Sequence, residues 1–468
     1  METPTNQEPS IKRGPLIIVL LSAAFIAILN QTLLGTALPP IMEELNLTET
    51  TVQWLQSIFM LVNGIMIPIT AFLIDRFTTR QLFLTAMCTF ALGTFICAIA
   101  PTFSFLMVGR VLQAAGAGVM MPLMQTIMFL IFPIDKRGSA MGLFGLVISF
   151  APAIGPSLSG WLVDHFPWRS VFYVVLPIAI INIIVAYFIL KNVTKQSHPK
   201  LDMLSIVLST LGFGGLLYGF SVAGDSSWSS MPVILSIIIG IITLTWFIYR
   251  QLHLEQPILE FRIFRYSVFT LTTVLGMIVF VAMIGTAVIV PLLMQNMLDF
   301  SALQSGLALL PGALIMGFMN PITGRLFDKY GARYLAIIGL ALVVVTTFMF
   351  ANLSTETTFA YIAIVNTFRM LGISMVMMPV TTAGLNQLPP HLIAHGSAMN
   401  NTMRQIAGSI GTALLVTVMT TIAKREPGVA GSIHGVNMSF LVAGIFAIIA
   451  FILALYIRNE GKETVKSQ

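Results

Sequence analysis

The chain has 468 residues, of which 57% are hydrophobic and only 9% are charged, and its mean hydropathy is +0.92. A soluble protein carries about 25% charged residues, so this composition excludes an ordinary soluble enzyme or binding domain. The net charge of +6 does not indicate a nucleic-acid surface, because the basic residues follow the loops of one membrane face.

Apolar stretches of about 20 residues, the length that spans roughly 30 Å of hydrocarbon, recur along the whole sequence. The chain is therefore predicted to be an all-α integral membrane protein. Fourteen transmembrane helices are predicted, at about 15–37, 52–74, 81–100, 103–130, 138–163, 169–190, 203–223, 231–250, 268–292, 303–324, 334–352, 358–385, 396–422 and 435–457.

The basic residues are distributed unequally between the loops. With both termini in the cytoplasm, 18 of the 24 Lys and Arg residues fall in inner loops and tails, three lie outside and three lie within the spans. This bias predicts a multi-pass protein of the cell membrane with both termini cytoplasmic. The acidic residues Glu43, Glu44 and Glu49 are then expected in an outer loop.

Two short charged turns share one pattern. The segments 70–80 and 323–333 both read (Gly/Ala)-x-Leu-x-Asp-(Arg/Lys), and their aspartates, Asp75 and Asp328, lie 253 positions apart. Two further matches have similar offsets of 257 and 258: Val-Met-Met-Pro at 119–122 and 376–379, and Gly-Ser-Ala-Met at 138–141 and 396–399. Three matches at nearly one offset indicate a duplicated membrane protein, which is how secondary transporters are built.

The duplication predicts two six-helix bundles separated by a two-helix insert. The expected parts are a cytoplasmic N-terminal tail (1–14), a first bundle (15–190), a linker with two extra helices (191–267), a second bundle (268–457) and a cytoplasmic C-terminal tail (458–468). No polar stretch is long enough to fold alone outside the membrane.

Several functional classes lack their motifs. The sequence has no Gly-x-x-x-x-Gly-Lys-(Ser/Thr) phosphate loop and no cysteine cluster, so no ATPase, enzyme activity, cofactor or metal site is expected. His391 and His395 have i, i+4 spacing but follow Pro389-Pro390, which predicts solvated residues of an inner loop.

The repeated turns predict a latch. Each aspartate lies at the inner end of a span, where a carboxylate can pair with cations or face the positive N-terminus of a neighbouring helix. Contacts of this kind can form in one transporter state and break in the other. The basic residues of the two turns considered for this latch are Arg76, Arg80, Arg325 and Arg333, together with Lys329.

These motifs resemble those of a known family. The charged turn resembles the signature loop of the major facilitator superfamily, although Ala71 and Thr78 stand where that family usually has glycines. Arg110-Val-Leu-Gln113 is similar to its Arg-x-x-Gln-Gly motif, and Gly155-Pro156-x-x-x-Gly160 is similar to the signature of its antiporters. With fourteen spans, the chain resembles the fourteen-helix drug:proton antiporter branch, in particular the lincomycin-resistance-type multidrug exporters of Gram-positive bacteria.

The resemblance implies alternating access around a central cavity, with Gly155, Pro156 and Gly160 as a hinge or seal. The polar residues expected in this cavity are Asn30, Arg110, Gln113, Arg369 and Arg404. Charged side chains inside a membrane by default mark a cavity, a pathway or a buried pair. A structural role with hydrogen bonds to helix carbonyls is the alternative for each arginine.

The sequence does not single out the proton-coupling group, because no acidic residue lies as deep in the spans as the three arginines. Asn30 also stands where the family usually has an acid. Asp164 and Asp225, at outer helix ends, are candidates, although they also fit solvated loop carboxylates, and Asp75 and Asp328 could titrate as the latch works.

The expected function is proton-coupled export of small amphipathic compounds by a monomeric bacterial membrane protein. Substrates, protons and the lipid bilayer are the expected partners, and nucleic acid is not. An exporter of anionic amphipaths such as fatty acids is the alternative, because the only deep charges are arginines. A membrane sensor or scaffold is the alternative outside transport.

Overall fold

The computed structural model describes residues 13–194, 196, 197, 199, 201–225, 228–426 and 428–457, without the side chains of Thr50, Gly224 and Asp225. It has fourteen helices that are long and apolar enough to cross a membrane. They are α1 (Arg13–Glu44), α2 (Glu49–Arg76), α3 (Thr79–Ala98), α4 (Phe103–Ile131), α5 (Arg137–His165), α6 (Ser170–Ile189), α7 (Met203–Asp225), α8 (Met231–His253), α9 (Ser267–Asn296), α10 (Ala302–Tyr330), α11 (Ala332–Phe350), α12 (Phe359–Asn386), α13 (Ile393–Arg425) and α14 (Val429–Leu455). Three short 3-10 helices, η1 (Ile134–Lys136), η2 (Phe261–Arg265) and η3 (Pro390–Leu392), precede α5, α9 and α13. The predicted all-helical membrane fold is confirmed, and most of the tails 1–14 and 458–468 lies outside the described residues.

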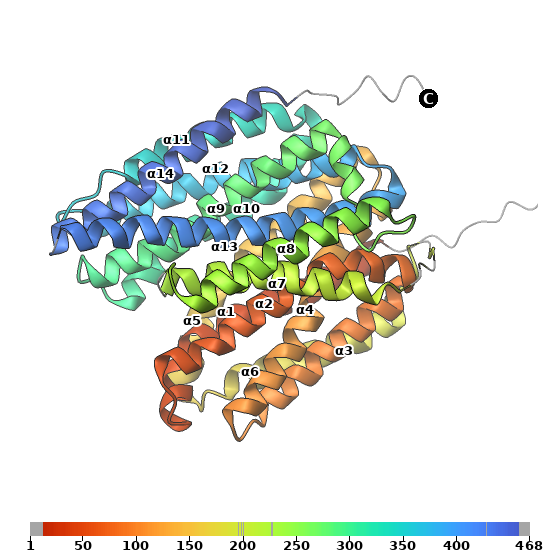
Figure 1. The fold of residues 1–468 in the computed structure, drawn as a ribbon, viewed down its shortest axis with the longest axis horizontal. Coiled ribbons are helices and arrows are strands. Elements are labelled where there is room, and N and C mark those ends of the chain that lie inside the picture. Colours follow the sequence, from red (N-terminus) through yellow and green to blue (C-terminus); the bar gives the residue numbers. More distant parts are fainter. Residues whose placement is uncertain are drawn as a thin grey trace, which may run out of the picture.

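The helices pack as two similar groups. In α1–α6, α1 packs on α5 and α4 packs on both α2 and α3; in α9–α14, α9 packs on α13 and α12 packs on both α10 and α11. The two groups lie one above the other in Figure 1, the first in red to yellow and the second in green to blue. We refer to them as the first half and the second half.

The turns between helices repeat the same geometry in both halves. Asn46 and Asp299, which are 253 positions apart, are the only described non-glycine residues with positive φ, at 50° and 54°. Asn and Asp are the side chains that best tolerate this left-handed conformation. Thr48 and Ser301, again 253 apart, then cap α2 and α10. The duplication seen in the sequence therefore extends to backbone conformation.

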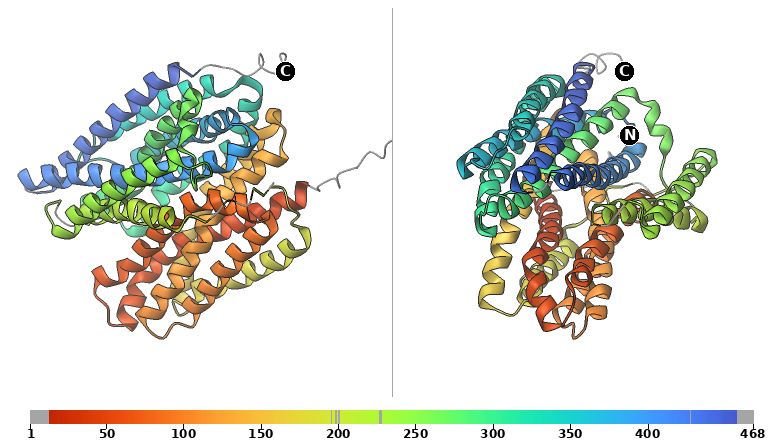
Figure 2. Two further views of the ribbon diagram at one scale, coloured as in Figure 1. Left: turned by 45° about the vertical axis from the view of Figure 1, so that its right-hand side comes forward. Right: turned by 60° about the vertical axis from the view of Figure 1, so that its left-hand side comes forward.

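The inserted helices α7 and α8 form an antiparallel hairpin on one flank, shown in yellow-green at the right of the right-hand view in Figure 2. Asp202 and Arg250 close its open end with a 2.8 Å ion pair, which holds the pKa of the Asp202 carboxyl below its usual range. Of the two hairpin helices, as far as they are described, α7 is the one that contacts both halves, since it packs against α2 and α13. The Trp228 Nε1–H also donates to Thr417 Oγ1 of α13 over 2.6 Å.

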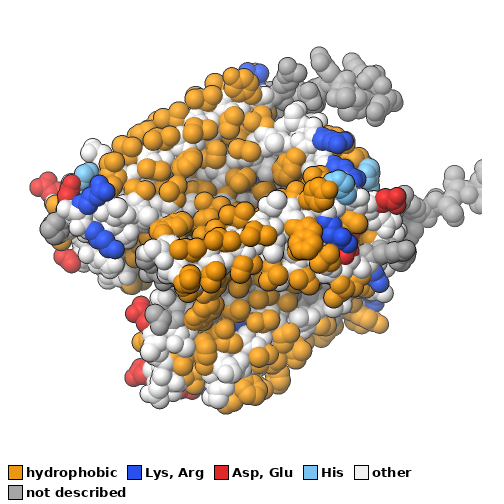
Figure 3. All heavy atoms as spheres, viewed as in Figure 1, with side chains coloured by type: hydrophobic (Ala, Val, Ile, Leu, Met, Phe, Trp, Pro, Cys, Tyr) orange, Lys and Arg blue, Asp and Glu red, His pale blue; other side chains and the backbone are white. Residues whose placement is uncertain are grey.

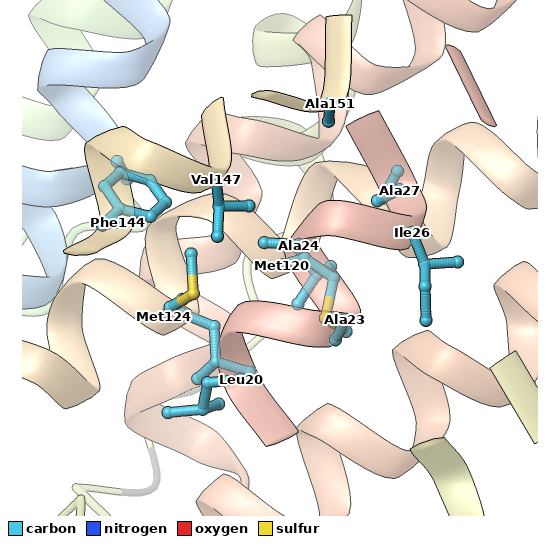
Figure 4. Packing of buried hydrophobic residues seen from close by; sticks show 14 of the residues in the cluster. Leu20, Ala23, Ala24, Ile26, Ala27, Met120, Met124, Phe144, Val147 and Ala151 are labelled. Atoms are coloured by element: carbon cyan, nitrogen blue, oxygen red, sulfur yellow. The ribbon is translucent and has the colours of Figure 1, made fainter. Parts of the chain in front are cut away.

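The interior of the first half is apolar where α1, α4 and α5 meet. Figure 4 shows Leu20 and Ala24 of α1, Met120 and Met124 of α4, and Phe144 of α5 filling this space. All five are buried. The methionines therefore serve here as flexible packing between helices.

Both ends of the described chain lie at the same end of the molecule, at the right of Figure 1, where α1 begins and α14 ends. We call this the termini end. On the face shown in Figure 3, an apolar belt separates charged side chains at the two ends. This is the surface that a bilayer requires of a multi-pass protein.

Two local predictions from the sequence were wrong. The expected acidic outer loop is largely helical, because α1 continues through Pro39 and Pro40 to Glu44, and Glu49 begins α2. The expected solvated histidine at 395 is buried in the first turn of α13. The 3-10 helix η3, which begins at Pro390, leads directly into α13, so α13 begins at Ile393, before the residue that hydropathy indicated.

Candidate functional site at the interface of the two halves

The first contact between the halves lies at the termini end, where Asp328 of α10 meets the first turn of α5. Its carboxylate accepts hydrogen bonds from the backbone N–H of Gly138 (2.7 Å) and from the backbone N–H (2.8 Å) and hydroxyl (2.5 Å) of Ser139. These N–H groups have no partner within the helix, and the helix dipole favours an anion there. We call this contact the α5–α10 latch.

Glycines allow the α5–α10 latch to close. A Cβ atom on Gly324 would lie 2.2 Å from the carbonyl oxygen of Gly138, and one on Gly138 would lie 2.5 Å from Asp328 Oδ1. Gly142 has a similar restriction, since its Cβ would lie 2.6 Å from the Asn320 carbonyl oxygen. The two backbones are therefore closer than any larger residue permits.

The second contact, the α2–α13 latch, is built differently. Asp75 lies at the end of α2, and its Oδ2 is 3.1 Å from Nε2 of His395 in α13. Ala71 replaces the glycine that Gly324 provides in α10, as the sequence comparison of the two turns indicated. Asp75 thus reaches a side chain of α13, whereas Asp328 reaches the backbone of α5.

The basic residues of the two turns have other partners or face solvent. Arg76 donates to the Pro199 carbonyl in the linker (3.1 Å), and the Arg80 guanidinium lies 4.4 Å from the Tyr187 ring centroid. Arg325 and Arg333 are exposed. Thr78 caps α3 with a capping box, whereas its counterpart Gly331 ends α10 with φ of 79°.

A chain of buried polar groups crosses the first half. Arg110 donates from Nε to the Leu55 carbonyl (3.0 Å) and from Nη1 to Gln113 (2.9 Å), and its guanidinium lies 4.2 Å from the Phe59 ring centroid. Gln113 donates in turn to Asn30 (3.3 Å) and Thr94 (2.9 Å). The sequence prediction grouped Asn30, Arg110 and Gln113, and the structure brings them into one network without a carboxylate.

The second half buries two further arginines. Arg369 donates to Thr347 and to the Ala282 carbonyl (3.1 Å), and Arg404 donates to Thr381. Within the described residues, Nη2 of Arg110 and Nε of Arg369 and Arg404 have no hydrogen-bond partner. The three guanidinium groups are thus held by neutral acceptors and retain unused donors.

Further polar contacts join the two halves. Gln125 of α4 accepts from Ser397 (2.8 Å) and Asn401 (2.7 Å) of α13, and Asn320 of α10 donates to Ser149 of α5 (2.9 Å). Ser149 and Asn320 lie about 15–18 Å along their helices from the termini end. Among the described residues, the side-chain hydrogen bonds between the halves all fall between the termini end and about this depth. The halves are therefore joined at the termini end.

The antiporter-like motif in α5 packs against α1. Gly155 faces Thr32, whose Oγ1 would lie 2.1 Å from a Cβ on that glycine. Pro156 is exposed, and Gly160 has open space where its Cβ would be. Close approach of two helices is thus required at Gly155 and not at Gly160.

The carboxylates at the opposite end differ in their surroundings. Asp164 is exposed near the end of α5, and the side chain of Asp225 lies outside the described residues. Glu44 accepts from Trp168 Nε1 and from Arg169 Nη1, both at 2.7 Å, while Arg169 Nη2 donates to the Ala100 carbonyl (2.8 Å). This group ties α1, α3 and α6 together within the first half.

A cavity of about 220 Å³ lies where the hairpin meets both halves. It is lined by residues of α2, α7 and α13: Gln53, Trp54, Ser57, Met60, Leu61, Leu217, Tyr218, Ser221, Val222, Gln405 and Ser409. Trp54 and Tyr218 stack with their ring centroids 5.8 Å apart. The lining combines aromatic and aliphatic surface with amides and hydroxyls, and it includes no charged side chain.

Sequence reasoning missed three of the residues that join the halves: His395, Gln125 and Asn320. Gln125 and Asn320 are polar residues within apolar spans, which is a usable signal because unpaired amides in a membrane are costly. His395 offered no such signal, since it lies beside a proline-rich turn.

Comparisons with known proteins agree with this architecture. A family model described as Major Facilitator Superfamily matches residues 20–412. The lincomycin resistance protein LmrB of Bacillus subtilis (strain 168) is 43% identical, over 98% of this chain and 98% of that protein. The fatty acid resistance protein FarB of Neisseria gonorrhoeae is 27% identical, over 89% of this chain and 82% of that protein.

The fold also matches a solved structure. The crystal structure of the human organic anion transporter MFSD10 (TETRAN) superposes with a TM-score of 0.70 at 14% identity, covering 96% of this chain and all of that chain. At this identity the match concerns the fold.

Proposed function

The chain belongs to the major facilitator superfamily, as a multi-pass transporter similar to resistance exporters, and we propose that it exports amphipathic compounds by alternating access in exchange for protons. The two halves, close to the expected ranges 15–190 and 268–457, move against each other around the polar interior. The proposed working unit is a single chain.

The observation that carries this proposal is that, among the described residues, the side-chain hydrogen bonds between the halves gather toward one end. Both latches and the other side-chain hydrogen bonds between the halves lie toward the termini end. We propose that this end is cytoplasmic, because most Lys and Arg residues of the sequence fall in the loops and tails that meet there. The structure then corresponds to an outward-facing state, in which the cytoplasmic latches are closed.

Collapse of the pH gradient is expected to abolish uphill export. Purified protein in liposomes, with an imposed pH gradient, should accumulate one of three probes: lincomycin, ethidium or a long-chain fatty acid. Nigericin, which dissipates that gradient, should return the probe to equilibrium. Protein-free liposomes are the control, and accumulation that survives nigericin would contradict proton coupling.

The cavity beside the hairpin supports a neutral or amphipathic substrate. Aromatic and aliphatic side chains offer apolar contact, while Gln53, Ser57 and Gln405 offer hydrogen bonds. This mixture is typical of small-molecule sites. LmrB, which is similar to this chain over almost its whole length, is named for resistance to lincomycin, and this supports a drug as the substrate.

Export of anionic amphipaths is the second candidate, and the buried arginines favour it. Each has an unused donor, and none is paired with a carboxylate in the described residues. An anion entering between the halves could satisfy these donors. The resistance named for FarB concerns such compounds.

Replacing Arg404 by glutamine separates the two candidates. We expect lincomycin and ethidium export to stay within about twofold of native, because a positive charge in the interior does not attract a neutral or cationic compound. If anions are the substrate, fatty-acid export should instead fall more than about tenfold, the effect of losing one desolvated charge pair. Export is measured per folded molecule, with Arg425→Gln at the opposite end of α13 as the control.

A further inference from the structure

We propose that His395 is the titrating group of the α2–α13 latch, and that its proton strengthens the closed latch. This inference rests on the proposed proton-driven function, but its test below does not depend on transport. The starting observation is that both ring nitrogens of a buried histidine are bonded, one to each side of a contact that must break when the termini end opens.

The two partners fix the state of the ring. Nδ1 of His395 lies 3.2 Å from the backbone N–H of Glu260, which can only donate, so Nδ1 carries a lone pair. Nε2 lies 3.1 Å from Asp75 Oδ2. A carboxylate accepts, so Nε2 carries the hydrogen. With these two contacts, the imidazole is neutral and its Nε2–H donates to Asp75.

The two bonds have different consequences for opening. Glu260 lies in the connector between α8 and α9, directly before η2 and outside the first half, so its bond to His395 does not cross between the two halves. Asp75 belongs to the first half, and its bond to His395 must break when the halves separate at the termini end. The Glu260 contact therefore positions the ring, while the Asp75 contact determines how firmly the latch holds.

Adding a proton to the ring shifts the equilibrium between the closed and open states only through the bond to Asp75. The proton binds the Nδ1 lone pair and the ring becomes an imidazolium, while Asp75 keeps its negative charge. The hydrogen bond to the Asp75 carboxylate, which until then has a charge on the acceptor alone, becomes an ion pair with a charge on both partners and is strengthened. The bond from Glu260 is lost in both states, so that loss cancels.

The other latch cannot respond in this way. Asp328 is held by two backbone N–H groups and a serine hydroxyl, none of which gains a proton near neutral pH. Histidine is the side chain whose charge changes in that range. The two latches of this duplicated protein are thus related in position and different in chemistry.

The charged surroundings of His395 are few. Arg76 follows Asp75 but donates to Pro199, Arg262 pairs with the Glu260 carboxylate (3.5 Å), and His391 lies one turn earlier in η3. The helices α4, α7, α9, α12 and α14 also pack against α13. Their only charged residues and histidines, all toward the opposite end, are Arg110, Asp225, Arg369 and His434. Within the described residues, Asp75 is the charged side chain that is hydrogen-bonded to this ring.

The direction in which pH changes the closure of the α2–α13 latch follows from this ion pair. Because the protonated ring favours the closed latch, the closed state binds this proton more tightly than the open state does. The added stability of closure is present at low pH and is lost as pH rises. Opening the termini end then favours release of the proton on that side, which is the direction that a proton-driven exporter requires.

The test measures opening of the latch directly. Ser397, which is fully buried beside Gln125, is replaced by cysteine in a chain lacking Cys88 and Cys97, and its labelling rate by a maleimide is followed from about pH 8 to pH 5.5. The same rate is measured in His395→Gln, whose amide offers one acceptor and one donor but cannot be protonated. The ratio of the two rates cancels the intrinsic pH dependence of the thiol.

We expect the two rates to agree near pH 8 and the native rate to fall about fivefold below that of His395→Gln by pH 5.5, the upper range for one partly exposed ion pair. Asp75→Asn, which keeps an acceptor but no charge, should also remove this fall. A ratio that stays constant over the whole range, with either variant, overturns the proposal. Asn401→Cys is the second reporter if Ser397→Cys does not fold.

The outcome is separable from that of the transport assay. Loss of nigericin sensitivity would contradict proton-driven export and leave the pH-dependent labelling intact. A flat labelling ratio in a protein whose export still collapses with nigericin would place the coupling proton elsewhere, with Asp164 and Asp225 next to be replaced.

Discussion

Replacing Gly324 by alanine is expected to lower export at least about tenfold. The added methyl group would lie 2.2 Å from the Gly138 carbonyl oxygen, so α5 and α10 could not reach the separation seen in the closed latch. Overpacking of this kind costs about 1–3 kcal/mol. The cost applies only when the termini end is closed, and about 1.4 kcal/mol already changes an equilibrium tenfold. The chain should therefore remain folded but accumulate in states open at the termini end.

Two measurements check this prediction. Export of the probe that the native chain transports fastest reports function, and maleimide labelling at Ser397→Cys reports opening, which should become faster. Gly160→Ala is the matched control, because its Cβ would meet no atom within 4 Å. Equal export by Gly324→Ala and Gly160→Ala would show that the close approach at Gly324 is not needed for the cycle.

Replacing Asp328 by asparagine should also reduce export more than about tenfold, and more severely than Asp75→Asn. Asp328 accepts from two backbone N–H groups and one hydroxyl. An asparagine offers only one oxygen, and its NH₂ group would face an N–H donor. Each charge-assisted bond contributes about 1.5–3 kcal/mol, so losing even one shifts the latch strongly toward open.

The comparison with Asp75→Asn tests whether contact chemistry, and not negative charge alone, sets the effect. The amide oxygen introduced by Asp75→Asn would still accept the single hydrogen bond from His395 Nε2, so near pH 8 that variant should lose less than about fivefold. Each variant removes one negative charge, so the two have the same net charge as each other, and export per folded molecule is the readout. If Asp75→Asn is as inactive as Asp328→Asn, the geometry described for the two latches does not explain their roles.

The fold was largely predictable from the sequence, because hydropathy and charge bias act over whole helices. Spans such as 103–130 and 203–223 agree with α4 and α7 to within two residues. The repeated aspartates lie at two helix ends where the halves make contact. The larger errors lie at helix ends, since hydropathy does not detect helical turns outside the membrane: α1 extends through two prolines to Glu44, α10 continues to Tyr330, and α14 begins at Val429.

The partners of the candidate site residues were less predictable. The sequence indicated that Asp328 could face either cations or a helix N-terminus, and only the packing of α5 on α10 selects the N-terminus. The role of Gly138 and Gly324 depends on that same crossing. Arg110 and Gln113 were expected together because they belong to one motif that resembles the family's, whereas Gln125 meets Ser397 through contacts between the halves that no local pattern encodes.

In the alternating access that we propose, the hairpin also constrains how the two halves can move. On one side of the molecule, α7 packs on α13 and on α2, where Trp54 and Tyr218 stack, whereas within the described part of the chain neither hairpin helix packs extensively on α5 or α10. A rigid element attached to both moving bodies along one edge acts as a pivot. The same small rotation then produces little displacement beside α7 and a larger one at the far edge, where Asp328 and the glycines lie. The two latches are thus at different distances from the axis, and the α5–α10 latch has the longer lever arm.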